Sequence, residues 1–262
     1  MGTARIFFPL YLPFRTRTMR RAHFSFSGGR RRAIISVWFG FARAFAARAA
    51  ERKGFCMKAL LVNGSPHAHG CTYTALCEVK QTLEANGVAA RLLHIGTQPV
   101  AGCIACGRCA RTGRCVFDDK VNEVLETLDE YSAIVLGSPV YYASASGQVC
   151  AFADRLFYAG GRRFAGKLGA CVVSCRRGGA SAAFDRLNKY FTIANMPVVP
   201  SQYWNQVHGR TPEEVRRDEE GLQTMRTLGQ NMAWLLQCIE AGQKAGVRPP
   251  VYEPPVATNF IR

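Results

Sequence analysis

The sequence predicts an α/β protein built on a doubly wound, five-stranded parallel sheet with helices on both faces. From Met57 onward, short apolar runs of strand length alternate with longer segments of helical spacing, the pattern of parallel strands joined by crossover helices. Each connection is long enough for a right-handed crossover, and a hydrophobic content of 48% can fill the core. We expect the strand order 2-1-3-4-5, which places ligands at the carboxyl ends of the strands, beside the switch point.

The individual elements follow from local signals in chain order. Each predicted strand is a short apolar run of the kind that is buried on both faces, and each predicted helix repeats apolar residues at three and four positions. The first helix ends at Asn86-Gly87, a typical C-cap, and the last begins at Thr211-Pro212-Glu213-Glu214, a capping box. The predicted strands are 59–62, 90–95, 133–136, 170–174 and 198–203, and the predicted helices are 71–85, about 119–130, 148–158, 180–193 and 211 to about 241.

Charge and proline content divide the chain into three parts. Residues 1–56 contain 12 Arg and Lys against the single acid Glu51, whereas the rest contains 22 against 17, so most of the net charge of +16 belongs to the first part. Because Met57 opens the first strand, we expect residues 1–56 to be a basic, disordered extension or a stretch upstream of the true start. Residues 57–241 form the predicted domain, and residues 242–262 form a Pro-rich C-terminal arm.

The N-terminal part also bears on location and partners. Its Arg-rich, acid-poor composition is compatible with a transit peptide, whereas a secretory signal would have an unusually long positive leader. The apolar stretch 33–47 is interrupted by Arg43, so we expect no membrane span. Eleven cysteines without an obvious export signal favour a reducing compartment, and therefore the cytoplasm. Nucleic-acid binding by residues 1–56 is a minor alternative.

The loop after the first strand predicts a phosphate site. Residues 64–72 lack the pattern G-x-G-x-x-G, which disfavours a dinucleotide pyrophosphate turn. The hydroxyls of Ser65 and Thr72 beside a helix N-terminus suit a terminal phosphate instead. An ordinary strand–helix turn is the alternative. Residues 161–167 imitate a P-loop, but Leu168 replaces the Ser or Thr that would bind magnesium, so we do not expect ATP chemistry.

The loops after the third and fourth strands predict a site for a flat ligand. An exposed pair of tyrosines after a proline is costly unless something flat stacks on it, and packing against a neighbouring subunit is the alternative. The next loop places two guanidinium groups beside flexible backbone, where they would bind an anionic group or remain solvated. The candidate residues are Pro139, Val140, Tyr141, Tyr142, Arg176, Arg177 and Gly178.

Four cysteines with the spacing C-x2-C-x2-C-x5-C lie between the second strand and the next helix. They are Cys103, Cys106, Cys109 and Cys115. Such a run is compatible with a [4Fe–4S] cluster, although its last gap differs from the ferredoxin pattern. Zinc is disfavoured because a second ligand pair is missing. Packed thiols or a labile disulfide remain as alternatives.

Four stretches together resemble the NADPH-dependent FMN reductase and iron–sulfur flavoprotein group of the flavodoxin-like superfamily. They are MKALLVNGSPHAHGCTYTAL, GCIACGRCARTGRCVFDD, GSPVYYASASGQVCAFADR and SCRRGG. The resemblance runs from residue 57 to about residue 239 and implies a flavodoxin-like fold with FMN as cofactor. It implies phosphate contacts at Ser65, His67, Cys71 and Thr72, with the isoalloxazine between residues 139–142 and 176–179. His67 stands where relatives usually carry Arg, Cys71 where Asn is common, and Cys150 where Lys is frequent.

We therefore expect an FMN-dependent oxidoreductase that accepts hydride from NADPH or NADH and reduces a flavin, a quinone or a similar small acceptor. No side chain need act as nucleophile or base, because the cofactor carries the chemistry. Arg176 and Arg177 would stabilise negative charge on the reduced ring. A homodimer is expected. The alternative is an electron carrier, fed by a ferredoxin, with a [4Fe–4S] cluster on the four clustered cysteines.

Overall fold

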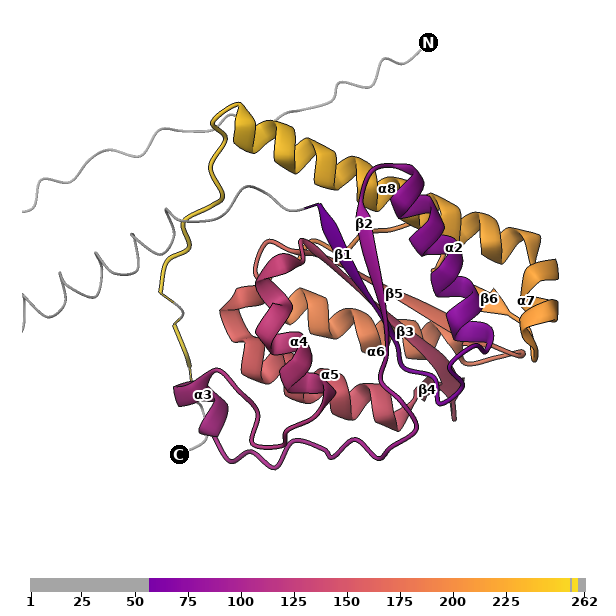
Figure 1. Ribbon diagram of the computed structural model, residues 1–262, viewed down its shortest axis with the longest axis horizontal. Coiled ribbons are helices and arrows are strands. Elements are labelled where there is room, and N and C mark those ends of the chain that lie inside the picture. The colour runs from indigo at the N-terminus through magenta and orange to yellow at the C-terminus, as the bar shows by residue number, and fades with distance from the viewer. Residues whose placement is uncertain (1–56, 255, 259–262) are drawn as a thin grey trace, which may run out of the picture. The chain divides into compact units, whose positions relative to one another are not determined.

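The computed structural model describes residues 57–254 and 256–258 (Figure 1), and the expectations for residues 1–56 fall outside them. The predicted fold class is confirmed: the parallel sheet has the order β2-β1-β3-β5-β6. Because the two-residue β4 only pairs antiparallel with β3, β6 is the fifth parallel strand and the order is the predicted 2-1-3-4-5. The strands are β1 (Lys58–Asn63), β2 (Ala89–His94), β3 (Ala133–Tyr141), β4 (Ser144–Ala145), β5 (Leu168–Cys175) and β6 (Gln206–His208).

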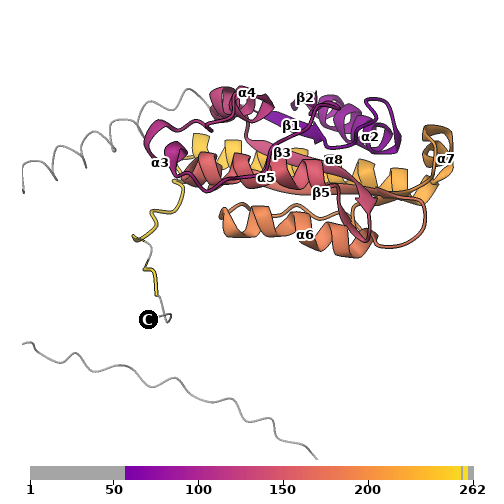
Figure 2. The same cartoon turned by 90° about the horizontal axis from the view of Figure 1, so that it is seen from below.

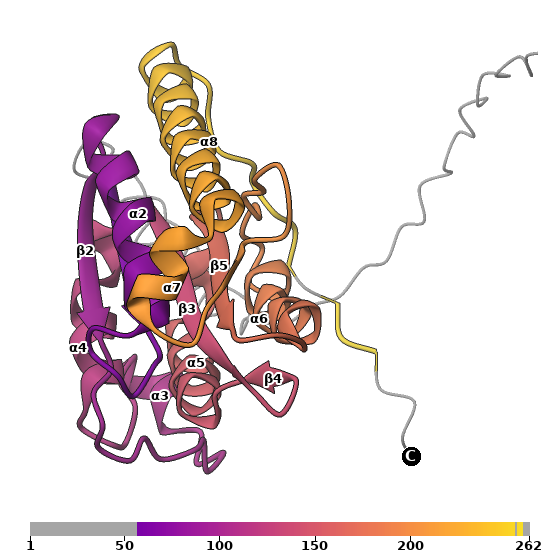
Figure 3. The same ribbon diagram turned by 90° about the vertical axis from the view of Figure 1, so that its right-hand side faces the viewer.

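Helices cover both faces of the sheet, so successive strand residues are buried on opposite sides. Leu60 packs in a cluster with α4, α5 and α6, whereas Leu61 packs in a second cluster with α2 and α8. Figures 1 and 3 show α2 and α8 side by side. No helix in the described part of the chain is both long and apolar enough to cross a bilayer. The α-helices are α2 (Cys71–Ala85), α3 (Arg108–Thr112), α4 (Lys120–Thr127), α5 (Gly147–Gly160), α6 (Ala180–Ile193), α7 (Pro212–Arg217) and α8 (Glu219–Lys244).

The fifth strand differs from the prediction. The predicted segment 198–203 makes a single bridge at Val198, and β6 forms further along the chain. Pro200 has no N–H to donate to a ladder. Ser201 closes a local turn instead, because its Oγ donates to the carbonyl oxygen of Tyr203 at 2.6 Å and accepts from the Tyr203 N–H at 3.3 Å. The edge strand is therefore interrupted before it resumes as β6.

The third strand is longer than predicted and turns back as a hairpin. The prediction placed Pro139 and Tyr141 in a loop, but β3 includes both and then pairs with β4. Pro139 is tolerated because β1 has already ended at Asn63, opposite Gly137, which leaves β5 as the neighbour at this level.

The long C-terminal helix expected from Thr211 is divided into α7 and α8. Asp218 ends the first helix and caps the second, since its carboxylate accepts from the Gly221 N–H at 3.0 Å. The predicted N-cap is confirmed: the Thr211 hydroxyl accepts from the Glu214 N–H at 3.3 Å. The Glu214 carboxylate reaches one residue further back than a capping box requires, to the N–H of Arg210.

Candidate functional site

The loops after β1, β3 and β5 meet at one edge of the sheet because these three parallel strands are neighbours. The Gly64 N–H donates to the Gly137 carbonyl oxygen at 2.8 Å. The buried hydroxyls of Thr72 and Ser174 lie 2.8 Å apart, and the Ser146 hydroxyl donates to the Gly64 carbonyl oxygen at 2.9 Å. The structure thus joins the three loops that the sequence singled out. We call residues 63–72, 137–147 and 174–179 the switch-point site.

The first loop is organised from inside by Asn63, a residue that the sequence reasoning missed. Asn63 is fully buried at the end of β1. Its side-chain oxygen accepts from the Ser65 N–H at 3.1 Å, and its amide nitrogen donates to the Ala68 carbonyl oxygen at 3.2 Å. The Ser65 hydroxyl in turn accepts from the His67 N–H at 3.1 Å. The signal available in the sequence was an Asn placed directly after an apolar strand, where it can set the shape of the following turn.

Two long helices begin at the switch-point site without a capping side chain. α2 follows Gly70 and α6 follows Gly179, and neither has a side-chain cap or an acid in its first turn. By contrast, α4, α5 and α8 are capped by Asp119, Ser146 and Asp218. Uncapped N–H groups and the positive end of the helix dipole suit an anion. The two uncapped N-termini at this edge, those of α2 and α6, therefore fit the phosphate of a nucleotide cofactor.

The predicted phosphate residues are placed differently from one another. Ser65 and Thr72 are buried within the loop, whereas His67 is exposed. The Cys71 thiol donates to the Gly209 carbonyl oxygen at 3.6 Å. Burial raises the pKa of the Cys71 thiol, as do the carboxylates of α7, against an opposing backbone hydrogen bond. This thiol is therefore held neutral, and the backbone of residue 71, rather than its side chain, is the better donor to an anion.

The hairpin between β3 and β4 carries the predicted tyrosines at a strained turn. Tyr142 has φ 49° and Ala143 has φ 57°, left-handed values that match a two-residue type I′ turn but are costly for residues with a Cβ. The Tyr142 side chain is fully exposed and that of Tyr141 is 46% exposed. An exposed aromatic pair on a strained turn fits a flat ligand that stacks on it.

Gly179, next to the predicted Gly178, joins the hairpin to the loop after β5. Gly179 has φ +88°, and a Cβ at this position would lie 2.7 Å from the Cα of Ala143 and 3.1 Å from a methyl group of Val140. At Gly178 an added Cβ would meet nothing within 4 Å. The close approach of the two loops therefore depends on Gly179. Its left-handed backbone, which the sequence does not reveal, is what distinguishes it from Gly178.

Three arginines lie in or beside the switch-point site. Arg176 and Arg177 are exposed on the loop after β5, as predicted. Arg210 was not predicted; it lines an open depression with His67 and Gly70 at the start of α2. Within the described residues, none of these three guanidinium groups has an ion-pair partner. They therefore remain available to an anionic ligand.

The four clustered cysteines line one small apolar cavity. Cys103, Cys106, Cys109 and Cys115 all contribute to its wall, in a segment that lies beside α4 and α5 (Figures 1 and 2). Among the described residues, no three His, Cys, Asp or Glu side chains converge closely enough to hold one metal ion. Four thiol side chains around one cavity are a ligand set of the kind that binds either zinc or an iron–sulfur cluster.

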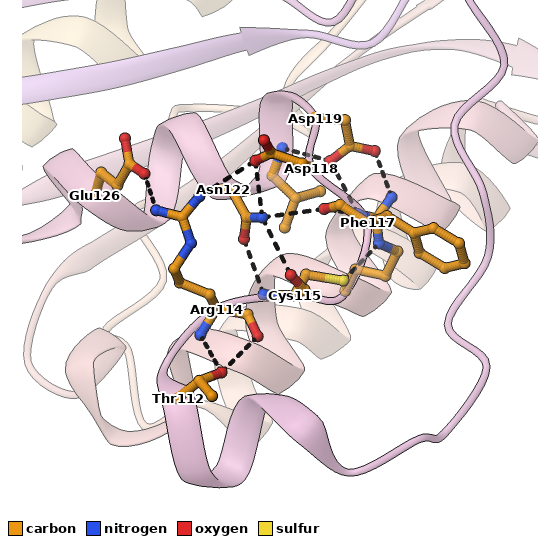
Figure 4. A network of polar contacts seen from close by, with 10 residues as sticks. Thr112, Arg114, Cys115, Phe117, Asp118, Asp119, Asn122 and Glu126 are labelled. Atoms are coloured by element: carbon orange, nitrogen blue, oxygen red, sulfur yellow. Dashed lines mark hydrogen bonds and ion pairs between the residues drawn. The ribbon is translucent and has the colours of Figure 1, made fainter.

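Cys115 is held far more firmly than the other three cysteines, and Figure 4 shows the polar contacts around it. The Cys115 N–H donates to the side-chain oxygen of the buried Asn122 at 2.8 Å, and the Asn122 amide donates back to the Cys115 carbonyl oxygen at 3.1 Å. The Cys115 sulfur accepts from Nε of Arg155 at 3.2 Å. Burial acts to lower the pKa of Arg155, but the bonds with Asp119 and Cys115 outweigh it and raise that pKa, so the cation persists. In contrast, Cys103 and Cys106 are exposed.

Residues 57–210 match the family described as NADPH-dependent FMN reductase. The chain belongs to this family. The resemblance found in four sequence stretches is therefore confirmed, and the protein is a flavin-dependent oxidoreductase of flavodoxin-like fold.

Individual relatives agree with the family assignment. This chain is 29% identical over 192 residues to an iron–sulfur flavoprotein from Methanocaldococcus jannaschii. The alignment covers 70% of this chain and 100% of the relative. The chain is 33% identical over 138 residues to an iron–sulfur flavoprotein from Archaeoglobus fulgidus, covering 51% and 68%. A solved WrbA-like flavodoxin from Agrobacterium tumefaciens superposes with a TM-score of 0.50 at 17% identity, covering 69% of this chain and 98% of that one.

Proposed function

We propose that this reductase-family protein binds FMN at the switch-point site and passes electrons from NADPH or NADH to a small acceptor such as a flavin or a quinone. The observation that carries the proposal is the meeting of three loops around two uncapped helix N-termini. Free N–H groups at helix N-termini favour a terminal phosphate. The exposed tyrosines beside it supply a surface for the flat ring of the same ligand.

In this proposal each part of the site has a distinct task. The N–H groups at the start of α2 and the Ser65 hydroxyl hold the phosphate, and Arg210 adds a positive charge beside the loop. The β3–β4 hairpin, with Tyr141 and Tyr142, orients the ring. Arg176 and Arg177 lie on the neighbouring loop, where positive charge stabilises negative charge that develops on the ring. FMN itself, when bound, supplies the hydride and electron chemistry.

A second candidate function is an iron–sulfur electron carrier, in which the flavin exchanges electrons with a ferredoxin. It is favoured by the single cavity that all four clustered cysteines line and by the two relatives named iron–sulfur flavoproteins. Cys103, Cys106, Cys109 and Cys115 would hold a [4Fe–4S] cluster, which supplies one-electron transfer. The two candidates share the FMN site and differ in the donor and in the iron.

Anaerobic purification of the full-length chain, followed by FMN and iron analysis, tests both candidates. The reductase predicts bound FMN whose absorbance bleaches rapidly on mixing with NADPH or NADH. The carrier predicts about four irons per chain and rapid bleaching by reduced ferredoxin, with little response to either nicotinamide. Protein that neither retains nor takes up FMN contradicts both.

The predicted homodimer belongs to the same proposal. The exposed aromatic side chains of Tyr203 and Trp204 lie outside the core, and large apolar side chains at a surface are typical of a covered interface. Light scattering on the eluted protein would report a dimer, and a monomer at micromolar concentration would contradict it.

A further inference from the structure

Arg155 on α5 is a buried cation, and all five of its N–H donors have partners. Its side chain is 1% exposed. Two donors bind the Asp119 carboxylate at 2.6 and 2.9 Å, and two others bind the carbonyl oxygens of Ala101 and Phe117 at 3.3 and 3.2 Å. The fifth, Nε–H, donates to the Cys115 sulfur at 3.2 Å. A guanidinium has five donors, so every donor of Arg155 binds an acceptor between residues 101 and 119.

The ion pair with Asp119 does not by itself account for this placement. The Asp119 carboxylate is 32% exposed, so the pair is only partly buried. Such a pair adds little net stability compared with well-packed apolar residues, and it does not require that Arg155 also donate to a sulfur. The carbonyl groups of Ala101 and Phe117 flank the four cysteines in sequence. Arg155 therefore ties the two ends of the cysteine segment together while it directs a positive charge at the sulfur of Cys115.

We propose that Arg155 is a positioning residue for the cysteine site: it holds the Cys115 sulfur at the cavity and favours the reduced form of a cluster bound there. This inference rests on the proposed [4Fe–4S] cluster. Hydrogen bonds to ligand sulfurs and nearby positive charge raise the reduction potential of such clusters. When the cluster gains one electron from a reductant such as dithionite, no proton is needed, because Arg155 is already charged.

Substitutions at Arg155 and at Asp119 separate this role from a structural one. Arg155→Gln removes the charge, Arg155→Lys keeps the charge but loses the planar fork, and Asp119→Asn removes the opposing charge while leaving the bond to sulfur. Asn is also as good an N-cap as Asp for α4. Arg163→Gln is the matched control, because Arg163 pairs with Asp129 and the Leu125 carbonyl, away from the cysteines.

The readouts are the midpoint potential of the cluster, from a dithionite titration followed by electron paramagnetic resonance, together with iron and FMN content. We expect a lower potential in Arg155→Gln, a smaller decrease in Arg155→Lys, and an increase in Asp119→Asn, with Arg163→Gln unchanged. A purely structural ion pair predicts effects of the same sign at Arg155 and Asp119, and this result overturns the proposal. Should both Arg155 variants lose iron, an increase in Asp119→Asn still supports the proposal, and a decrease or loss of iron there overturns it.

Absence of the cluster and absence of an effect of Arg155 give different results. If the unaltered chain binds FMN but takes up no iron, the cluster is absent and the inference about Arg155 falls with it. If the unaltered chain holds iron and all Arg155 variants keep its potential, only the inference about Arg155 falls.

Discussion

The switch-point site and the cysteine segment (residues 101–118) are built in opposite ways. The first is made of strand ends that are joined by buried contacts, such as the Gly64–Gly137 bond and the Thr72–Ser174 pair. In the second, α3 has no buried residue, and firm contacts are concentrated around Cys115. The sheet therefore fixes the loops of the switch-point site relative to one another, whereas the cysteine segment is held mainly at its Cys115 end.

The largest expected effect is loss of iron from the cysteine segment alone. Cys106 lines the cavity and is exposed, so Cys106→Ala removes a proposed cluster ligand without removing a buried contact. We expect iron to fall to background while FMN content and thermal stability remain as in the unaltered chain. Cys77→Ala, outside the cavity, serves as control. Iron analysis of the reconstituted variants checks this, and a Cys106→Ala protein with a full complement of iron would exclude this residue as a ligand.

The next largest effect is expected at the switch-point site. Gly179→Ala adds a Cβ 2.7 Å from the Ala143 backbone at φ +88°, which combines overpacking with backbone strain worth about 1–3 kcal/mol. The hairpin and the loop after β5 should separate, and FMN affinity should fall by about tenfold or more. Fluorescence titration with FMN measures this. Gly178→Ala, which meets open space, should change affinity much less; equal effects of the two substitutions would contradict the contact between the loops.

A smaller effect, on stability and iron retention, is expected where Asn122 holds the Cys115 end of the cysteine segment. Asn122 is 2% exposed and binds both backbone groups of Cys115 and the carbonyl of Phe117. Asn122→Ala should lower the free energy of unfolding by about 1–3 kcal/mol, because buried backbone groups lose partners. Iron retention should fall with it, while FMN affinity holds. Urea unfolding and iron analysis test this against Thr112→Ala, whose hydroxyl bonds are exposed.

The smallest effect at neutral pH concerns the buried thiol of Cys171 in β5, which belongs to neither site. Burial raises the pKa of Cys171 above the ordinary value of 9.0, and Asp185 adds to the rise. The neutral thiol stabilises the fold below pH 9.0, and this contribution is lost as the pH rises further, because only the unfolded thiol ionises there. The free energy of unfolding should decline by up to about 1.4 kcal/mol per pH unit from this group. Urea unfolding on either side of that pH should give a shallower decline in Cys171→Ala; identical slopes would contradict the assignment.

Much of the fold could be predicted because it depends on local patterns. The helices α2 and α6 have the predicted bounds, and the strand order is the one expected of this doubly wound architecture. The fifth strand was misplaced because an apolar run containing Pro200 satisfies a hydropathy pattern but not a hydrogen-bond ladder. The split at Asp218 was missed because apolar spacing continues across it.

The candidate site was predictable in position but not in detail. The carboxyl ends of parallel strands meet in any such sheet, so the three loops could be chosen from the sequence. Asn63 could have been found from its position directly after an apolar strand. Gly179 and Arg210 act through long-range contacts that no spacing rule reveals. Arg155 lies 40 residues from Cys115 in the sequence. Nothing in the sequence distinguishes it from an ordinary helix residue, so its contact with Cys115 could not be predicted.

A comparison of FMN with riboflavin tests the central claim most directly. If the start of α2 and the loop around Asn63 hold the phosphate, the cofactor-free chain should bind FMN far more tightly than riboflavin, which has the same ring and no phosphate. Added salt should narrow the difference, because it screens the charge at the site. Equal affinity for the two compounds, or no binding of either, would contradict the proposed FMN site.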